Sequence, residues 1–264
     1  MQRHLPLAVL AVLALAPVAR AVDLAEIKAA GTLRVLVSAD EQPEAFALTA
    51  GAAAAGFERD LIEGFAKSQG LKLQVVTIAS FDQIIPALVK GEGDVIVGII
   101  ETDARHKQID FTVDTLPGRH LAVNLKPKPP IESLDELRAA RVGTIPGTSW
   151  AEAATAAGVK AGNNVSCADL PQLLDALRSG KAGAVVMSTP DFAIAQRREP
   201  NLQAGTFVGP PTRAAWGVRL KDVALRDALS DFLFNTRNSQ AWGQMVIKYF
   251  NTEALELFKR ARKQ

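Results

Sequence analysis

Hydrophobic and polar positions follow two alternating periods along most of this chain. Short runs of branched apolar residues, typical of buried strands, alternate with segments whose apolar residues lie three and four positions apart, typical of amphipathic helices. In the first half, strands are expected at 32–38, 71–78 and 94–98, and helices at 56–66 and 81–90. This order predicts a mainly parallel sheet covered by helices on both faces.

The same alternation starts again after residue 131. Expected helices lie at 133–137, 147–157, 170–178 and 191–198, expected strands at 141–145, 182–187 and 215–219, and two amphipathic helices follow. The stretch 208–212 interrupts regular structure, and its prolines, like those of segment 124–131, mark a boundary. The sequence therefore predicts an α/β protein of two Rossmann-like lobes joined by a two-strand hinge. Lobe 1 is expected at 22–117 plus 211–264, and lobe 2 at 118–210.

The first 21 residues have the features of a cleaved signal peptide. Arg3 and His4 precede an apolar run, and Ala19-Arg20-Ala21 supplies the small residues of a cleavage site. The run is shorter than the ~20 residues of a membrane-spanning helix. Cys167 lies too far from the cleavage point to carry a lipid. We therefore expect a periplasmic protein that is not a lipoprotein.

Charge and composition exclude several partners. Removing Arg3 and Arg20 leaves 28 basic residues against 28 acidic ones, a balance that does not favour nucleic acid or an anionic membrane. Beyond the signal segment, His106 and His120 are the only histidines, and no cysteine pair accompanies them. We expect no metal and no cofactor.

Two facing lobes place the ligand site between them. Parallel sheets expose backbone groups and helix N-termini at their carboxyl edges. Two such edges facing each other across a hinge make a cleft that closes on a small molecule.

Several motifs, in this order, resemble one family. They include Thr-Asp-Ala-Arg at 102–105 followed by Asp-Phe at 110–111, and then Val-Gly-Thr-Ile-Pro-Gly-Thr at 142–148. The segments 31–35, 56–61, 81–88 and 93–98 add to the match. Together they resemble the polar-amino-acid-binding branch of the periplasmic solute-binding proteins, extracellular family 3. The resemblance implies a type II periplasmic-binding fold in a monomeric, non-enzymatic receptor that delivers its ligand to an ABC permease.

The resemblance also implies roles for individual residues. Arg105 matches the arginine that binds the ligand carboxylate, for which its planar fork is suited. Thr148 and Ser149 match groups that complete the carboxylate site at a helix N-terminus. Gly98 matches a position where the backbone approaches the ligand. Five further residues complete the candidate set. Phe46 and Phe81 match aromatic positions that flank the ligand side chain, and Ile145 ends the expected strand 141–145. Ile100 and Ser188 occupy ligand-binding positions but depart from the family pattern.

Two of these positions depart from the family pattern. Where relatives hold the ligand's α-ammonium with an aspartate and a hydroxyl, this chain has Ser188 and Ile100. A buried ammonium without acceptors is costly. The ligand is therefore expected to be an amino-acid-like organic acid without a standard α-ammonium, or an amine held in a different pose. A relocated acidic anchor is available from four residues: Asp40, Glu41, Glu101 and Asp191.

Two other functions remain open. One is an accessory or chaperone-like binding protein that partners an oxidoreductase or a sensor. The other is a cyclic-acid dehydratase, which requires a general acid in the cleft. Asp191 is the one candidate for that acid. For Trp150 the sequence allows two positions, either packed under the N-terminus of its helix or lining the cleft.

Overall fold

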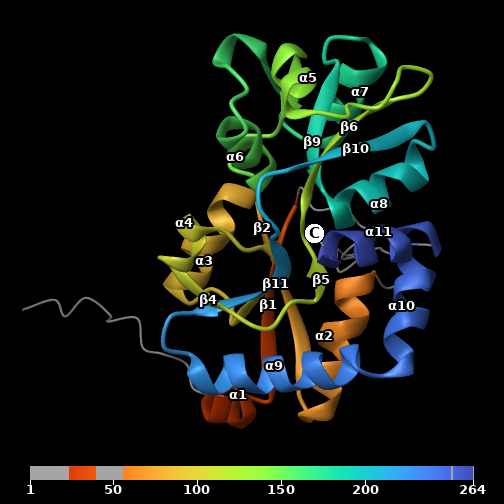
Figure 1. The fold of residues 1–264 in the computed structure, drawn as a ribbon. Helices are drawn as coiled ribbons and strands as arrows, with labels where there is room; N and C mark the ends of the chain where they lie inside the picture. Colours follow the sequence, from red (N-terminus) through yellow and green to blue (C-terminus); the bar gives the residue numbers. More distant parts are fainter. Residues whose placement is uncertain (1–23, 40–55, 251, 264) are drawn as a thin grey trace, which may run out of the picture.

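The computed structural model describes residues 24–39, 56–250 and 252–263 (Figure 1). The expected signal peptide lies outside these ranges, as do Phe46, Asp40 and Glu41. None of the helices within them combines the length and apolar character that a bilayer crossing requires.

The first sheet has the order β2-β1-β3-β11-β4, with β5 also paired to β11. Its strands are β1 (Thr32–Ser38), β2 (Lys72–Ile78), β3 (Val95–Ile100), β4 (Ile109–Phe111), β5 (Leu116–Pro117) and β11 (Arg213–Arg219). β1 runs parallel to β2 and β3, whereas β11 runs antiparallel to β3. β11 reverses direction because it enters as the chain returns from the second sheet.

Helices cover both faces of this sheet, as the alternation predicts. They are α1 (Leu24–Ala30), α2 (Phe57–Ser68), α3 (Ile84–Lys90) after the 3₁₀ turn η1 (Phe81–Gln83), α4 (Asp103–His106), α9 (Val223–Arg237), α10 (Gln240–Phe250) and α11 (Thr252–Lys263). Val35 and Val37 pack in the cluster that contains α2, while Leu36 packs with α3 on the other face. The C-terminal region holds three helices rather than the expected two.

The second sheet has the order β10-β6-β9-β7-β8. Its strands are β6 (His120–Leu125), β7 (Val142–Thr144), β8 (Asn164–Ser166), β9 (Ala184–Ser188) and β10 (Leu202–Val208). Its helices are α5 (Leu134–Ala139), α6 (Ser149–Ala156), α7 (Leu170–Arg178) and α8 (Thr189–Arg198), with the 3₁₀ turn η2 (Ala161–Asn163). The α/β class and the two-sheet architecture predicted from the sequence are confirmed.

Strands β4, β5, β6, β8 and β10 were not predicted, and the proline-rich boundary at 124–131 is wrong. Asn124 and Leu125 belong to β6 and pair with β10, so this segment starts inside the second sheet. The chain crosses between the sheets after Pro117 and again after Val208. Prolines mark a loop here because Pro cannot continue the hydrogen-bond ladder of the strand before it.

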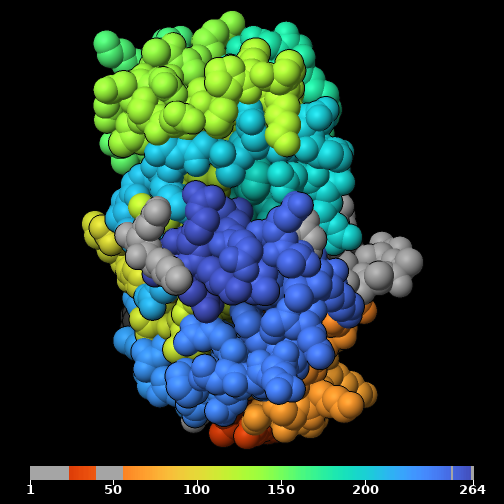
Figure 2. All heavy atoms as spheres, turned by 45° about the vertical axis from the view of Figure 1, so that its right-hand side comes forward, coloured from red at the N-terminus to blue at the C-terminus, as the bar shows by residue number. Residues whose placement is uncertain are grey.

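Two helices pack across the junction between the halves. Ala193 and Ile194 of α8 belong to the core cluster of the first sheet, and Leu257 of α11 belongs to that of the second. In Figure 2 the dark-blue C-terminal segment lies where the two halves meet. The crossings are therefore supported by packed helices as well as by the two connecting segments.

Candidate functional site

A cavity of about 600 Å³ lies between the two sheets. The first half contributes residues of α2, η1, β3 and α4 to its wall. The second half contributes the β7–α6 turn, the β8–α7 connection and the first turn of α8. Both halves are thus needed to complete the site.

Arg105 brings a buried positive charge to this cavity. Thr102 caps the short helix α4 by accepting a hydrogen bond from the Arg105 backbone N–H. The side chain is 6% exposed, its Nη1 donates to the Ile100 carbonyl at 2.6 Å, and its guanidinium lies 5.2 Å from the Phe81 ring centroid. Burial lowers the pKa of Arg105, with Glu152 acting in the opposite direction. No carboxylate among the described residues lies within ion-pair distance of this guanidinium.

The N-terminus of α6 lines the second half of the cavity. Gly147 has φ +77°, which the turn before the helix requires and which glycine adopts without strain. Thr148 is the N-cap, accepting from the Ala151 N–H and donating its hydroxyl to the Ile145 carbonyl at 2.7 Å. The first backbone N–H groups of a helix have no intrahelical partner and attract an anion.

His120 supports this helix end from behind. Its Nε2 lies 2.9 Å from the Ser149 hydroxyl, and both side chains are buried. Burial and then the charge of Arg105 lower the pKa of His120 to about 4. The imidazole is therefore neutral at neutral pH. From the sequence, His120 was considered only as a metal ligand.

Ser188 does not line the cavity, contrary to its place in the predicted set. It is fully buried and is the N-cap of α8, accepting from the Asp191 N–H and donating its hydroxyl to the Asp191 carboxylate. The hydroxyl therefore spends both its donor and an acceptor site on hydrogen bonds within α8.

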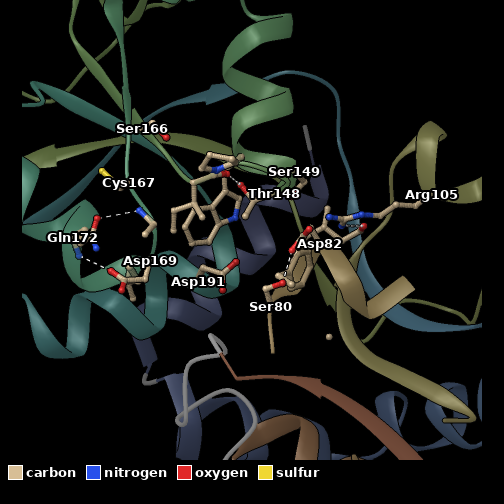
Figure 3. A pocket seen from close by; sticks show the side chains of 18 of the residues that line it. Ser80, Asp82, Arg105, Thr148, Ser149, Ser166, Cys167, Asp169, Gln172 and Asp191 are labelled. Atoms are coloured by element: carbon tan, nitrogen blue, oxygen red, sulfur yellow. Dashed lines mark hydrogen bonds between the residues drawn. The ribbon is translucent and has the colours of Figure 1, made fainter. Parts of the chain in front are cut away.

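Asp191 lines the cavity instead, one turn further into α8. The Trp150 side chain also hydrogen-bonds to its carboxylate, so Trp150 both packs at the helix and lines the cleft. Burial raises the pKa of Asp191 to about 6 despite the hydrogen bonds from Ser188 and Trp150. In the view of Figure 3, Asp191 lies between Asp169 on one side and Asp82 and Arg105 on the other.

Glu58 is a second acidic residue in the wall, and it was missed. It is 5% exposed, with Oε1 accepting from the Thr115 hydroxyl at 3.0 Å and Oε2 from the Trp216 indole at 2.6 Å. Burial raises its pKa to about 7 against these two hydrogen bonds. Gly98 leaves room for it, because a Cβ there would lie 3.2 Å from the Glu58 Cγ at a φ of +64°. An acid in the first turn of a helix is ordinary, so no sequence signal identified Glu58.

Seven predicted residues are brought together in the cavity wall: Phe81, Gly98, Ile100, Arg105, Ile145, Thr148 and Ser149. Phe46 lies outside the described residues. Glu101 is not in the wall and instead pairs with Arg213 at 2.8 Å and with His106. In the described part of the chain, no group of three metal-ligating side chains lies close enough to hold an ion.

Comparison with known proteins finds relatives of two kinds. A probable histidine-binding protein of Campylobacter jejuni is 33% identical over 132 residues, 50% of each chain. A membrane-bound lytic murein transglycosylase F of Pseudomonas putida is 23% identical over 202 residues, 74% of this chain and 42% of the relative. The chain thus spans about half the length, or less, of these curated relatives.

Solved structures share most of this fold. An ancestral amino acid-binding protein, described as a precursor of cyclohexadienyl dehydratase, matches with a TM-score of 0.74 and 25% identity over 86% of this chain and 99% of its own. The fold is that of type II periplasmic-binding proteins. The family model of the bacterial extracellular solute-binding proteins, family 3, matches residues 33–252. With most of its length matched, the chain belongs to that family.

Proposed function

We propose that this protein is a periplasmic receptor of an ABC-type importer that binds a small carboxylate between its two lobes. The lobes are residues 22–117 with 211–264, and 118–210, in a monomer exported by the signal peptide 1–21. The observation that carries the proposal is the Arg105 guanidinium, which is buried in the cavity wall without an ionic partner among the described residues.

A ligand carboxylate would compensate this buried charge. An arginine stays protonated in proteins, and an isolated buried charge is strongly disfavoured. A carboxylate can accept two parallel N–H bonds from the guanidinium fork. The N-terminus of α6 with Thr148 and Ser149 supplies further donors from the other lobe. The cavity volume of about 600 Å³ suits a small metabolite.

The residues found where relatives hold the α-ammonium of their ligand favour an amino-acid-like organic acid over a standard α-amino acid. Ile100 lines the wall there, and the Ser188 hydroxyl is bound within α8. An α-ammonium placed at these residues would lose its hydrogen bonds to water without gaining acceptors. Two of the similar proteins are named for binding histidine or amino acids, which supports a ligand of this size.

A dehydratase is the second candidate, because one observation favours it. Asp191 lines the cavity with a pKa of about 6, which is suited to a general acid near neutral pH. A receptor returns its ligand unchanged, whereas a dehydratase returns a product that has lost water. Recovery of the ligand by mass spectrometry after incubation therefore separates the two functions.

The test is a thermal-shift screen of the protein lacking residues 1–21, with Arg105→Gln as the variant. The library pairs amino acids with their hydroxy, keto and des-amino analogues. A ligand at a hundredfold excess over its Kd stabilises the native state by about 2.7 kcal/mol. We expect a carboxylate to raise the Tm of the wild type and not of the variant. No shift from any carboxylate would contradict the proposal and favour a protein partner.

A further inference from the structure

We propose that His120 is a positioning residue, which orients the Ser149 hydroxyl so that it donates a hydrogen bond to the ligand carboxylate. In this assignment the imidazole donates from Nε2 to Ser149 Oγ, and the hydroxyl proton is directed into the cavity. The inference rests on the proposed carboxylate site and adds to it a residue that does not line the cavity itself.

The backbone of β6 fixes the place of His120. It is the first residue of this strand after the chain crosses from the first sheet, and it pairs with Ser188 of β9 on one side and with Val208 of β10 on the other. Its side chain is buried. A buried side chain on a central strand has little freedom to turn away, so it can hold a neighbouring group in one orientation.

Ser149 connects this imidazole to the cavity. It is the first residue of α6, is itself buried and forms part of the cavity wall. The hydroxyl lies 2.9 Å from His120 Nε2 and has no second hydrogen-bond partner among the described residues. A hydroxyl carries one proton and two lone pairs, so His120 decides whether a donor or only an acceptor is left for a ligand.

The neighbouring hydroxyl cannot take this role. Thr148 donates its hydroxyl proton to the Ile145 carbonyl at 2.7 Å and accepts from the Ala151 N–H as the helix cap. An ionised carboxylate is an acceptor only. Of the two hydroxyls at this helix end, Ser149 is therefore the one with a proton to give to such a ligand.

The surroundings of the imidazole favour the tautomer with the proton on Nε2. The ring is neutral at neutral pH, because burial and the charge of Arg105 lower its pKa to about 4, and it therefore carries a single N–H. Nδ1 has no hydrogen-bond partner among the described residues. A proton there would leave an N–H group unsatisfied, and for backbone groups such orphaned donors are rarer than under-satisfied acceptors. A proton on Nε2 instead meets the Ser149 oxygen.

A bound carboxylate strengthens this preference. The hydrogen bonds then run in one direction, from Nε2–H to Ser149 Oγ and from the hydroxyl to the ligand, and each polarises the next. With the proton on Nδ1, the hydroxyl would donate to Nε2, and its lone pairs would face the negative charge. His120 thus selects an acceptor at this end of the cavity without carrying a charge of its own.

Nitrogen-15 NMR reads the tautomer directly. The protein lacking residues 1–21 contains two histidines, His106 and His120, so a spectrum of His106→Gln assigns both rings. The probe is 3-phenylpropanoate, the des-amino analogue of phenylalanine, at pH 7.5. We expect the saturated complex to show a neutral His120 ring protonated on Nε2. A proton on Nδ1 would overturn the inference, because Ser149 would then donate to the imidazole.

Variants separate positioning from packing. His120→Phe keeps a ring without a donor and should weaken 3-phenylpropanoate binding about tenfold by calorimetry, as expected for one lost hydrogen bond. His120→Gln places an amide N–H near the position of Nε2 and should recover most of this loss. In a Ser149→Ala background, His120→Phe should change the affinity less than about twofold, because the hydroxyl that it positions is absent.

His106→Gln is the matched control, since His106 contacts Glu101 and the Phe111 ring outside the cavity wall and should leave the affinity unchanged. Wild-type affinity in His120→Phe, or an equal loss with and without the Ser149 hydroxyl, would overturn the role of His120 alone. The tautomer measurement needs no His120 variant, so it decides the question even if His120→Phe does not fold. Binding of 3-phenylpropanoate that survives Arg105→Gln, or no binding by any carboxylate of the screen, would overturn the carboxylate site itself.

Discussion

At the scale of single residues, the site stands out by three ionisable side chains that have no ionic partner among the described residues. Arg105, Glu58 and Asp191 are held by a carbonyl, hydroxyls and indoles rather than by opposite charges of the described chain. Buried ionisable groups with perturbed pKa values gather at functional sites for this reason. Arg105 was predictable from its motif. Glu58 was not, because its burial depends on Trp216, 158 positions away.

Replacing Glu58 with glutamine should stabilise the free protein at high pH. Burial raises the folded-state pKa of Glu58 from 4.5 to about 7, so the native state binds more protons than the unfolded chain between these values. The contribution of Glu58 to stability therefore falls as the pH rises through this window. At pH 8, Glu58→Gln should unfold with a free energy roughly 1–3 kcal/mol higher than the wild type.

Urea unfolding of both proteins at pH 4 and pH 8 checks this. At pH 4 most Glu58 side chains are protonated in both the folded and the unfolded protein. The difference in unfolding free energy between Glu58→Gln and the wild type should therefore shrink towards zero. A glutamine variant that is less stable at pH 8, or a difference independent of pH, would show that the charged form of Glu58 is favoured by the fold.

At the scale of elements, most strands and helices of the βαβ repeats were predictable, whereas the short strand β8 and the connecting strands were not. Strands such as β1 and helices such as α2 carry strong periodicity, and their bounds agree with the structure. β10 lacks a clear pattern because its register shifts between Ala204 and Phe207. Gly205 falls within this shift, where a Cβ would lie 2.2 Å from the Ile131 carbonyl oxygen. This close approach of a distant backbone leaves no trace in the local sequence.

The N-terminus of α6 provides a prediction at this scale. Thr148→Ala removes the cap of the helix, which should lower the free energy of unfolding by ~1 kcal/mol and weaken carboxylate binding. Thr148→Ser keeps the hydroxyl and should retain both properties. Thr155→Ala is the control, because Thr155 donates to the Ala151 carbonyl on the exposed side of the same helix. Urea unfolding and calorimetry check these variants; equal affinity for Thr148→Ala and wild type would exclude the helix end from the site.

At the scale of the whole molecule, the site exists only because two sheets face each other. The sequence predicted the two halves and the cleft between them, but not which acid of the second half reaches it. The sequence offered Asp40, Glu41, Asp191 and, more weakly, Glu101 as relocated anchors. The structure places Asp191 in the wall and Glu101 in an ion pair with Arg213, while Asp40 and Glu41 lie outside the described residues. Such a choice depends on how the halves are packed, to which α8 and α11 contribute.

A ligand held by both halves should protect both walls at once. Hydrogen exchange measured by mass spectrometry should slow on binding at residues 102–106 and at 147–152, because α4 and α6 both face the cavity. Helix α5, remote from the wall, serves as the internal reference and should not change. Protection of one wall alone would mean that the ligand does not bridge the lobes.

The most direct measurement of the central claim is a calorimetric titration of the best-binding carboxylate and of its neutral primary amide. Wild type and Arg105→Gln are compared with both ligands. The account predicts that the amide binds the wild type at least a hundredfold more weakly than the carboxylate, since a charge-assisted pair with Arg105 is lost. It also predicts that Arg105→Gln binds both weakly and about equally. If the amide and the carboxylate bind the wild type with the same affinity, the cavity is not a carboxylate site.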